Sequence, residues 1–126
     1  MLEAVAHAKK RGKGTDAITP GWFGRWFIAS QEPPVKTRYR TVKKVTPGTE
    51  GDGQAALRDF ADSHSEARRV MASWDEFDFN RVRFTNPFVP VLRFTLGTGL
   101  MIINAHDRRH LWQAQRVKEF EGYPAA

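Results

Sequence analysis

The sequence predicts an all-α fold within one domain that spans residues 1–126. Two long segments carry this prediction, because their apolar residues recur at the three- and four-residue spacing of helices that pack against other helices. The length fits one domain, and nine Phe and four Trp residues supply enough apolar surface for one core. We therefore expect a helical bundle around a single core.

The first predicted helix covers residues 1–12. Its apolar residues follow helical spacing, and Gly12 and Gly14 close the basic run KKRGKG, as glycines commonly do at helix ends. No residue at the start can cap the helix, and an uncapped helix of about 11 residues is marginal in isolation. We therefore expect the chain to begin partway along a longer helix.

Residues 14–48 are predicted to form a long irregular connection. They hold four of the seven prolines, and the cluster PGWFGRWF predicts a single short turn of helix near residues 22–28. The net charge of +6 originates in the front of the chain, because residues 1–48 hold ten Lys or Arg against three acidic residues. Five of these cations lie between Lys36 and Lys44, after four aromatic residues. Cations with aromatic rings are the parts of single-stranded nucleic-acid sites, but they also suit a solvated loop.

The clearest helix is predicted over residues 53–74, with Asp52 as its N-cap. Its inward seam consists of six residues at spacings of three and four, namely Leu57, Phe60, His64, Ala67, Met71 and Trp74. A second long helix is predicted over residues 91–120, begun by Pro90 and ended by Gly122. We expect these two helices to pack roughly antiparallel.

Polar residues stand where the core side of the last helix should be. Its inner stripe consists of Leu96, Leu100, Ile103, Asp107, His110, Ala114 and Val117, widened by Gly99, His106 and Gln113. Because His106 and His110 are four residues apart, their imidazoles project from one side of the helix, one turn apart. Two imidazoles at this spacing can bind the same Zn, Ni or Fe ion. Core histidines with separate hydrogen-bond partners would show the same spacing. The residues alone leave both interpretations open.

Other catalytic sites are less well supported by the sequence. The chain has no cysteine, so a thiolate metal site and a cysteine nucleophile are excluded. The stretch HDRRH has both histidines of the zinc-protease helix HExxH, but Asp107 replaces the general-base glutamate and is one methylene shorter. The sequence therefore does not favour a protease.

The last predicted helix carries a second pattern around the histidine pair. His106, Arg109, His110 and Gln113 form the motif H-x-x-R-H-x-x-Q. With this motif, the chain resembles the DinB-like (YfiT-like) family of four-helix-bundle proteins over about residues 1–124, most strongly from residue 53 onward. The resemblance implies an incomplete four-helix bundle, in which the first helix and the front of the second helix are missing.

The resemblance also implies a metal site. In that family a divalent metal is held by three histidines, two on the last helix and one on the second. His106 and His110 match the pair, whereas the third histidine would fall upstream of this sequence, and His64 is the expected substitute because it faces inward. Asp107 and Gln113 are expected as outer hydrogen-bonding partners of the ligands. Because its triad is incomplete, the chain as given is expected to hold little metal tightly.

The function implied by the resemblance is divalent-metal binding, in a protein related to metal-dependent transferases or isomerases that use low-molecular-weight thiols. The implied cofactors are Zn or Ni and such a thiol, with a small molecule as substrate. One alternative is a basic nucleic-acid-binding module formed by residues 20–44, although no nucleic-acid fold signature supports it. Another is a shortened, non-catalytic relative, whose exposed apolar groove would favour a homodimer.

The absence of two sequence features, a membrane-spanning segment and a signal peptide, bears on where in the cell the protein is expected. No stretch approaches the roughly 18 to 20 consecutive apolar residues of a membrane-spanning helix. The N-terminus does not show the basic, apolar and small-residue regions of a signal peptide in order. We therefore expect a cytoplasmic protein without a membrane partner.

Overall fold

The computed structural model describes residues 17–36, 46, 51–74, 77–87 and 89–124. These residues form helices α2 (Trp22–Gln31), α3 (Gly53–Ala72) and α4 (Leu96–Lys118) and strands β1 (Arg83–Thr85) and β2 (Arg93–Thr95). The predicted all-α class is confirmed, since each strand has only three residues. None of these helices combines the length and the apolar character that crossing a membrane requires. The helix predicted over residues 1–12 lies outside the described residues.

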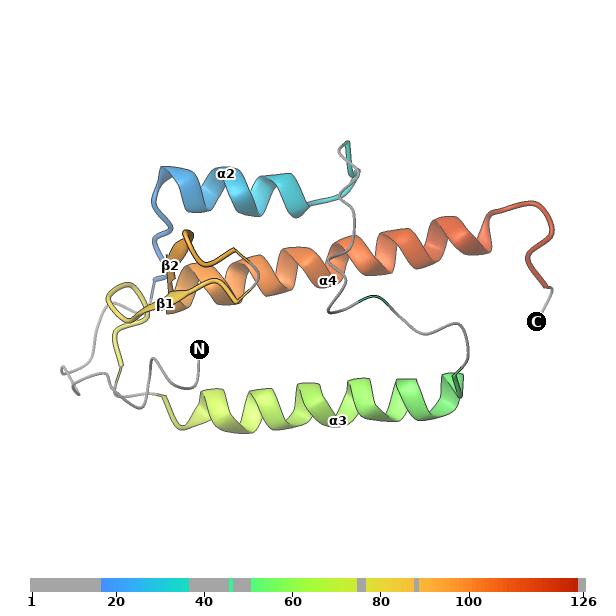
Figure 1. The fold of residues 1–126 in the computed structure, drawn as a ribbon, viewed down its shortest axis with the longest axis horizontal. Helices are drawn as coiled ribbons and strands as arrows, with labels where there is room; N and C mark the ends of the chain where they lie inside the picture. Colours follow the sequence, from blue (N-terminus) through green and yellow to red (C-terminus); the bar gives the residue numbers. More distant parts are fainter. Residues whose placement is uncertain (1–16, 37–45, 47–50, 75–76, 88, 125–126) are drawn as a thin grey trace.

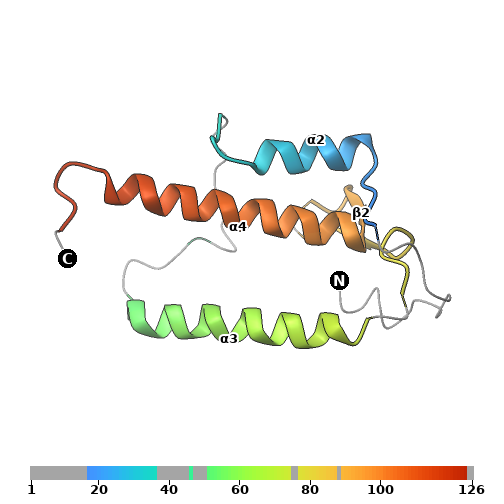
Figure 2. The same ribbon diagram turned by 180° about the vertical axis from the view of Figure 1, so that it is seen from behind.

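Helix α4 is the central element of the described fold (Figure 1). Helix α2 lies along one side of α4 and runs in the same direction, while α3 lies along the opposite side and runs the opposite way (Figure 2). The two long helices are thus antiparallel, as the sequence predicts. The short hairpin of β1 and β2 lies at the end of the molecule where α2 and α4 begin.

Helix α2 lies within the predicted irregular connection, where the sequence indicates only a short turn. The structure shows a ten-residue helix there. The Phe23 ring stacks on the Phe94 ring with centroids 6.0 Å apart, and the Phe27 ring lies 5.5 Å from the same ring. The helix ends at Gln31, and extended Glu32 precedes a pair of prolines, as residues before proline prefer. The contact with Phe94 stabilises α2 in spite of its unfavourable local composition.

The close packing of α2 on α4 requires a glycine. Gly24 is buried, and a Cβ atom at this position would lie 2.8 Å from Cγ2 of Thr98. Thr98 is itself only 3% exposed, so its methyl group has little room to move away. The side chain of any other residue at position 24 would push the two helices apart.

Helix α3 begins as predicted but packs over less of its length. The carboxylate of Asp52 accepts a hydrogen bond from the backbone N–H of Gln54 at 2.8 Å, which confirms the predicted N-cap. The predicted inward seam is wrong for the first half of the helix, because Leu57 is 62% exposed and Phe60 is 55% exposed. The described hairpin and the buried start of α4 lie at the other end of α3, so among the described residues that end gains the packed surface.

Strands β1 and β2 form an antiparallel hairpin that the sequence analysis does not predict. Phe84 lies opposite Phe94, and Arg83 lies opposite Thr95. Phe94 is 4% exposed, and it receives the aromatic rings of α2 on its face. The hairpin therefore links the start of α4 to the start of α2.

Helix α4 begins at Leu96, five residues after the predicted start at residue 91. The hydroxyl oxygen of Thr95 accepts a hydrogen bond from the backbone N–H of Thr98 at 3.3 Å and caps the helix. The prediction that Pro90 begins the helix is wrong, because Arg93–Thr95 pair with the neighbouring strand instead. The helix ends at Lys118, two residues before the predicted end at residue 120.

The core lies where the first turn of α4 meets the end of α3. Leu96 is completely buried and packs in one cluster with Trp74, which is 6% exposed. The partly buried residues around them are Val70, Met71, Phe77, Phe79 and Val82. Beyond the first turn of α4, Ala105 and Arg109 are its buried residues. Most side chains in the second half of this helix therefore face solvent.

Candidate metal centre

The predicted histidine pair comes together on the exposed part of α4. The Nε2 atoms of His106 and His110 are 2.9 Å apart. Their rings are nearly perpendicular, with an angle of 85° and centroids 4.4 Å apart. Both residues are exposed, so an ion or small molecule can reach them.

A chain of hydrogen bonds from α2 orients the His106 ring. Ser30 donates its hydroxyl hydrogen to the carbonyl of Phe27 at 2.6 Å, so its oxygen can accept from the Gln31 amide nitrogen at 3.1 Å. This contact directs Oε1 of Gln31 toward Nδ1 of His106, at 3.3 Å. Because an amide oxygen is only an acceptor, Nδ1 of His106 carries the hydrogen. Its Nε2 then presents a lone pair.

The His110 ring is oriented in the same way from within α4. Its Nδ1 lies 3.0 Å from Oε1 of Gln113, one turn further along the helix. This acceptor also places the hydrogen on Nδ1 and the lone pair on Nε2. Two lone pairs 2.9 Å apart repel each other unless a proton or a metal ion lies with them. The geometry therefore fits a hydrogen or a metal ion shared by the two Nε2 atoms.

The surroundings of His106 favour the neutral imidazole. Its pKa is lowered, first because partial burial of the ring disfavours its charged form and next because of the charges of His110 and Arg109. Asp107 acts in the opposite direction. The neutral ring is the form that binds a metal.

The expected third ligand, His64, contacts Asp107 and not the histidine pair. Its side chain projects from α3 toward α4, with Nε2 3.5 Å from Oδ2 of Asp107. Its Nδ1 donates to the carbonyl of Phe60 at 2.9 Å, and its ring lies against the Phe60 ring with centroids 3.9 Å apart. Asp107, expected beside the ligands, thus contacts His64. A role of His64 as a ligand remains a prediction that would require it to leave Asp107.

The residues fit two positions of a metal site. Two nitrogens at the usual metal–imidazole distance of about 2.0–2.1 Å are about 2.9 Å apart when they bind at a right angle. The two Nε2 atoms have this separation. Among the described residues, no group of three or more His, Asp or Glu side chains is placed to hold a metal ion. The described chain therefore supplies half of a four-coordinate site.

Gln31 is the site residue that the sequence analysis missed. It is 7% exposed and reaches the pair from the end of α2, a helix that the sequence does not predict. Gly24 and Gln31 are seven residues apart and both are buried, which is the two-turn spacing of one helix face. The same end of α2 is held to α4 by Glu32, which accepts from Nε of Arg108 at 2.9 Å. This hydrogen bond is the main cause of the lowered pKa of Glu32.

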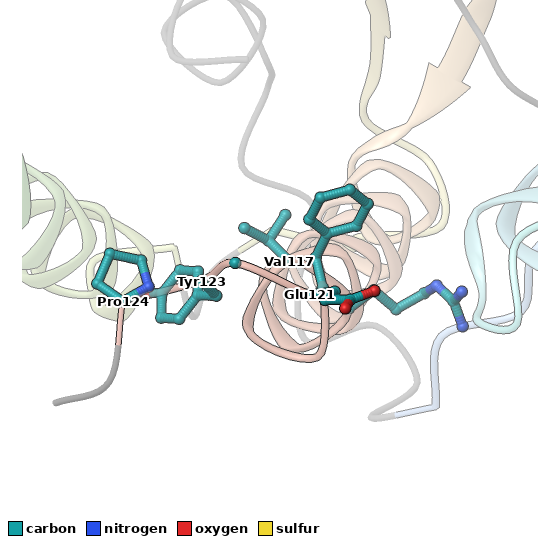
Figure 3. A pocket seen from close by; sticks show the side chains of 7 residues that line it. Val117, Glu121, Tyr123 and Pro124 are labelled. Atoms are coloured by element: carbon teal, nitrogen blue, oxygen red, sulfur yellow. The ribbon is translucent and has the colours of Figure 1, made fainter.

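A second feature, an open pocket of about 560 Å³, lies past the end of α4. Figure 3 shows Val117 and Glu121 on one side and Tyr123 and Pro124 on the other. The lining is mostly apolar and does not include the histidine pair. The pocket is therefore separate from the candidate metal centre.

Comparison with known proteins identifies the family. A family model described as the DinB superfamily matches residues 13–114. The matched span contains α2, α3, the hairpin and the part of α4 that carries His106, His110 and Gln113. No curated protein and no solved structure matches the chain. Since the family model covers most of the sequence, the chain belongs to the DinB superfamily.

Proposed function

We propose that this chain binds a divalent metal ion, Zn²⁺ or Ni²⁺, through His106 and His110. The observation that carries the proposal is the pair of convergent Nε2 atoms, each opposite an Nδ1 that faces an amide oxygen. Metal-bound histidines commonly have this arrangement, because a hydrogen-bond acceptor at one ring nitrogen fixes the lone pair at the other. In this proposal the protein is related to metal-dependent thiol transferases or isomerases.

The side chains around the pair have defined roles in this proposal. Gln31 and Gln113 accept the Nδ1 hydrogens and keep both Nε2 lone pairs available. A bound divalent ion would supply Lewis acidity, lowering the pKa of a thiol ligand so that thiolate exists near neutral pH. The exposure of both histidines leaves space for such a small ligand.

The direct test is calorimetric titration of the untagged chain with Ni²⁺ and with Zn²⁺ near pH 7.5. Because the described residues supply two ligands only, we expect weak but saturable binding that is lost in a His110→Ala variant and retained in a matched His64→Ala variant. Circular dichroism should show equal helix content in all three proteins. Absence of saturable binding in the unmodified chain, or equal binding by the His110→Ala variant, would contradict the proposal.

The nucleic-acid alternative rests on a different surface. Trp22 is 77% exposed and Trp26 is 58% exposed on α2, as stacking residues for unpaired bases would be. A gel shift with single-stranded DNA tests this alternative, which predicts binding that weakens steeply with salt and is lost in a Trp22→Ala, Trp26→Ala double variant. The His110→Ala variant should leave such binding unchanged.

A further inference from the structure

Two side chains at the end of α2 contact α4 next to the histidine pair. Oε1 of Gln31 faces Nδ1 of His106 at 3.3 Å. The carboxylate of Glu32, the next residue, accepts from Nε of Arg108 at 2.9 Å and also from its Nη2. A carboxylate and a guanidinium joined by two parallel hydrogen bonds fix distance and orientation together. The end of α2 is thus joined to α4 at two neighbouring points.

The two contacts lie on opposite sides of α4. The side of α4 that faces α2 carries Thr98, whose methyl group lies close to Gly24, and the buried Ala105 two turns later. Successive residues of a helix are about 100° apart around its axis, so His106 and Arg108 lie on either side of this line. The two contacts therefore hold the end of α2 from both sides of α4.

The contact of Gln31 with His106 depends on the position of the end of α2. At 3.3 Å it is a long hydrogen bond, which a small displacement of the helix end breaks. Helix ends fray readily, and α2 ends at Gln31 itself. The aromatic contacts with Phe94 come from the first six residues of α2. Among the described residues, the ion pair of Glu32 with Arg108 is thus the charged contact that joins this helix end to α4.

The ion pair is too exposed to contribute much to the stability of the whole fold. The side chains of Arg108 and Glu32 are 52% and 36% exposed, and ion pairs in such positions rarely change the free energy of unfolding measurably. The pKa of Glu32 is lowered, first because of the hydrogen bond from Arg108, so the carboxylate is ionised near neutral pH. The pair is therefore better suited to positioning its neighbour than to stabilising the fold.

The position of Gln31 decides which nitrogen of His106 carries the hydrogen. Ser30 accepts from the Gln31 amide nitrogen, so the amide oxygen faces the ring. An imidazole without an acceptor at Nδ1 can carry its hydrogen on Nε2 instead. That nitrogen then has no lone pair for a metal ion.

We propose that Glu32 and Arg108 are positioning residues of the candidate metal centre. Their ion pair keeps Gln31 against His106 and thereby keeps the hydrogen of this ring on Nδ1. This inference rests on the proposed function and deepens it, since it names residues outside the site that control whether a ligand atom is available. A change in the pair affects the ion only through the end of α2.

The first experiment reads the position of the hydrogen directly. Long-range ¹H–¹⁵N NMR spectra of the metal-free 126-residue chain at pH 8 distinguish a ring nitrogen that carries a hydrogen from one that does not. In the unmodified chain we expect Nδ1 of His106 to carry it. The single variants Glu32→Arg and Arg108→Glu place like charges opposite each other and should each shift the hydrogen toward Nε2. The double variant with both changes should restore it.

Glu66→Arg is the matched control. Glu66 forms an ion pair with Arg69 on α3 that also has two hydrogen bonds and is also exposed, so breaking it should leave the His106 ring unchanged. Circular dichroism and urea unfolding should give the same result for all these proteins. Arg108→Gln, which removes the charge without adding repulsion, replaces any single variant that loses helix content.

Calorimetric titration with Ni²⁺ tests the consequence for the metal. Both single variants should bind about tenfold more weakly than the unmodified chain, the lower end of the usual loss when an outer partner of a ligand is removed. The double variant and Glu66→Arg should bind as tightly as the unmodified chain.

The outcomes separate this inference from the proposed function. An unchanged His106 hydrogen in both single variants, or no restoration in the double variant, overturns the positioning role whether or not Ni²⁺ binds. Unchanged Ni²⁺ affinity in single variants whose hydrogen has moved overturns the effect on the metal. Absence of Ni²⁺ binding by the unmodified chain overturns the proposed function, while a His106 hydrogen that follows the ion pair still supports the positioning role.

Discussion

At the scale of single residues, the candidate centre depends on hydrogen placement as much as on the two ligands. The histidines could be predicted from their four-residue spacing, and Gln113 from the motif that contains them. Gln31 could not, because its approach to His106 spans 75 residues and depends on a helix that local composition disfavours. The spacing within one helix thus predicts the residues that α4 contributes to the centre, but not the residue that α2 contributes.

We expect Gln31→Leu to weaken Ni²⁺ binding by about 10- to 100-fold, the usual effect of removing an outer partner of a histidine ligand. Leucine has similar size but no acceptor, so the His106 ring loses the contact that places its hydrogen on Nδ1. Calorimetric titration measures the change. Gln115→Leu on α4 is the matched control and should bind as tightly as the unmodified chain; equal affinities for both variants would show that Gln31 does not orient the ligand.

The lowered pKa of His106 predicts a pH dependence of stability. A histidine whose pKa is lower in the folded chain than in the unfolded chain stabilises the fold above its unfolded pKa of about 6.5. This stabilisation is lost as the pH falls below that value, since the unfolded chain then binds more protons.

Urea unfolding of the metal-free chain at pH 7.5 and pH 5.5 tests this expectation. The unmodified chain should lose more free energy of unfolding between these two conditions than a His106→Gln variant does. An equal loss in both proteins would show that the titration of His106 does not contribute. Both measurements need chelator, because bound metal would also dissociate as its ligands become protonated.

At the scale of elements, tertiary contacts decide what the local pattern leaves undetermined. The cap and helical character of α3 follow from local sequence, and the structure confirms both. Helix α2 and the hairpin depend on aromatic contacts between segments about 70 residues apart, such as that of Phe23 with Phe94. Local periodicity contains no information about such a partner, which is why the sequence predicts a turn for α2 and an early start for α4.

Gly24→Val should destabilise the fold by about 1–3 kcal/mol, the usual cost of forcing extra volume into a packed interface. The new side chain would meet the buried Thr98 methyl group at 2.8 Å from its first atom. Thermal and urea unfolding measure the change. Gly51→Val is the matched control, because a Cβ there has nothing within 4 Å and the residue lies outside the helices. Similar unfolding of Gly24→Val and the unmodified chain would show that α2 does not pack closely on α4.

At the scale of the whole molecule, most buried apolar side chains of the described residues gather at one end. Leu96 and Trp74 form the centre of this core, while Leu57 at the far end of α3 is 62% exposed. The all-α class and the antiparallel long helices follow from helical periodicity, which marks one face of each helix. Periodicity cannot show which part of that face finds a partner, so the predicted seam of α3 extends too far.

This asymmetry predicts unequal effects of two leucine substitutions. Leu96→Ala should lower the free energy of unfolding by about 2–5 kcal/mol, because it leaves a cavity in the core. Leu57→Ala should change it by less than about 1 kcal/mol, since the side chain is mostly exposed and only helix propensity differs. Urea unfolding of both variants gives the comparison, and equal losses would place Leu57 in a packed environment.

The confinement of the core to one end also divides α4 into parts of different local stability. Its first turns are stabilised by the buried Leu96 and by contacts with the hairpin, whereas the turns that carry His106 and His110 have few buried side chains. Segments of the second kind open more often without unfolding of the whole chain. His106 and His110 can bind one ion together only while the turn between them is helical. A bound ion would therefore slow amide hydrogen exchange in these turns and leave the exchange rate at Leu96 unchanged.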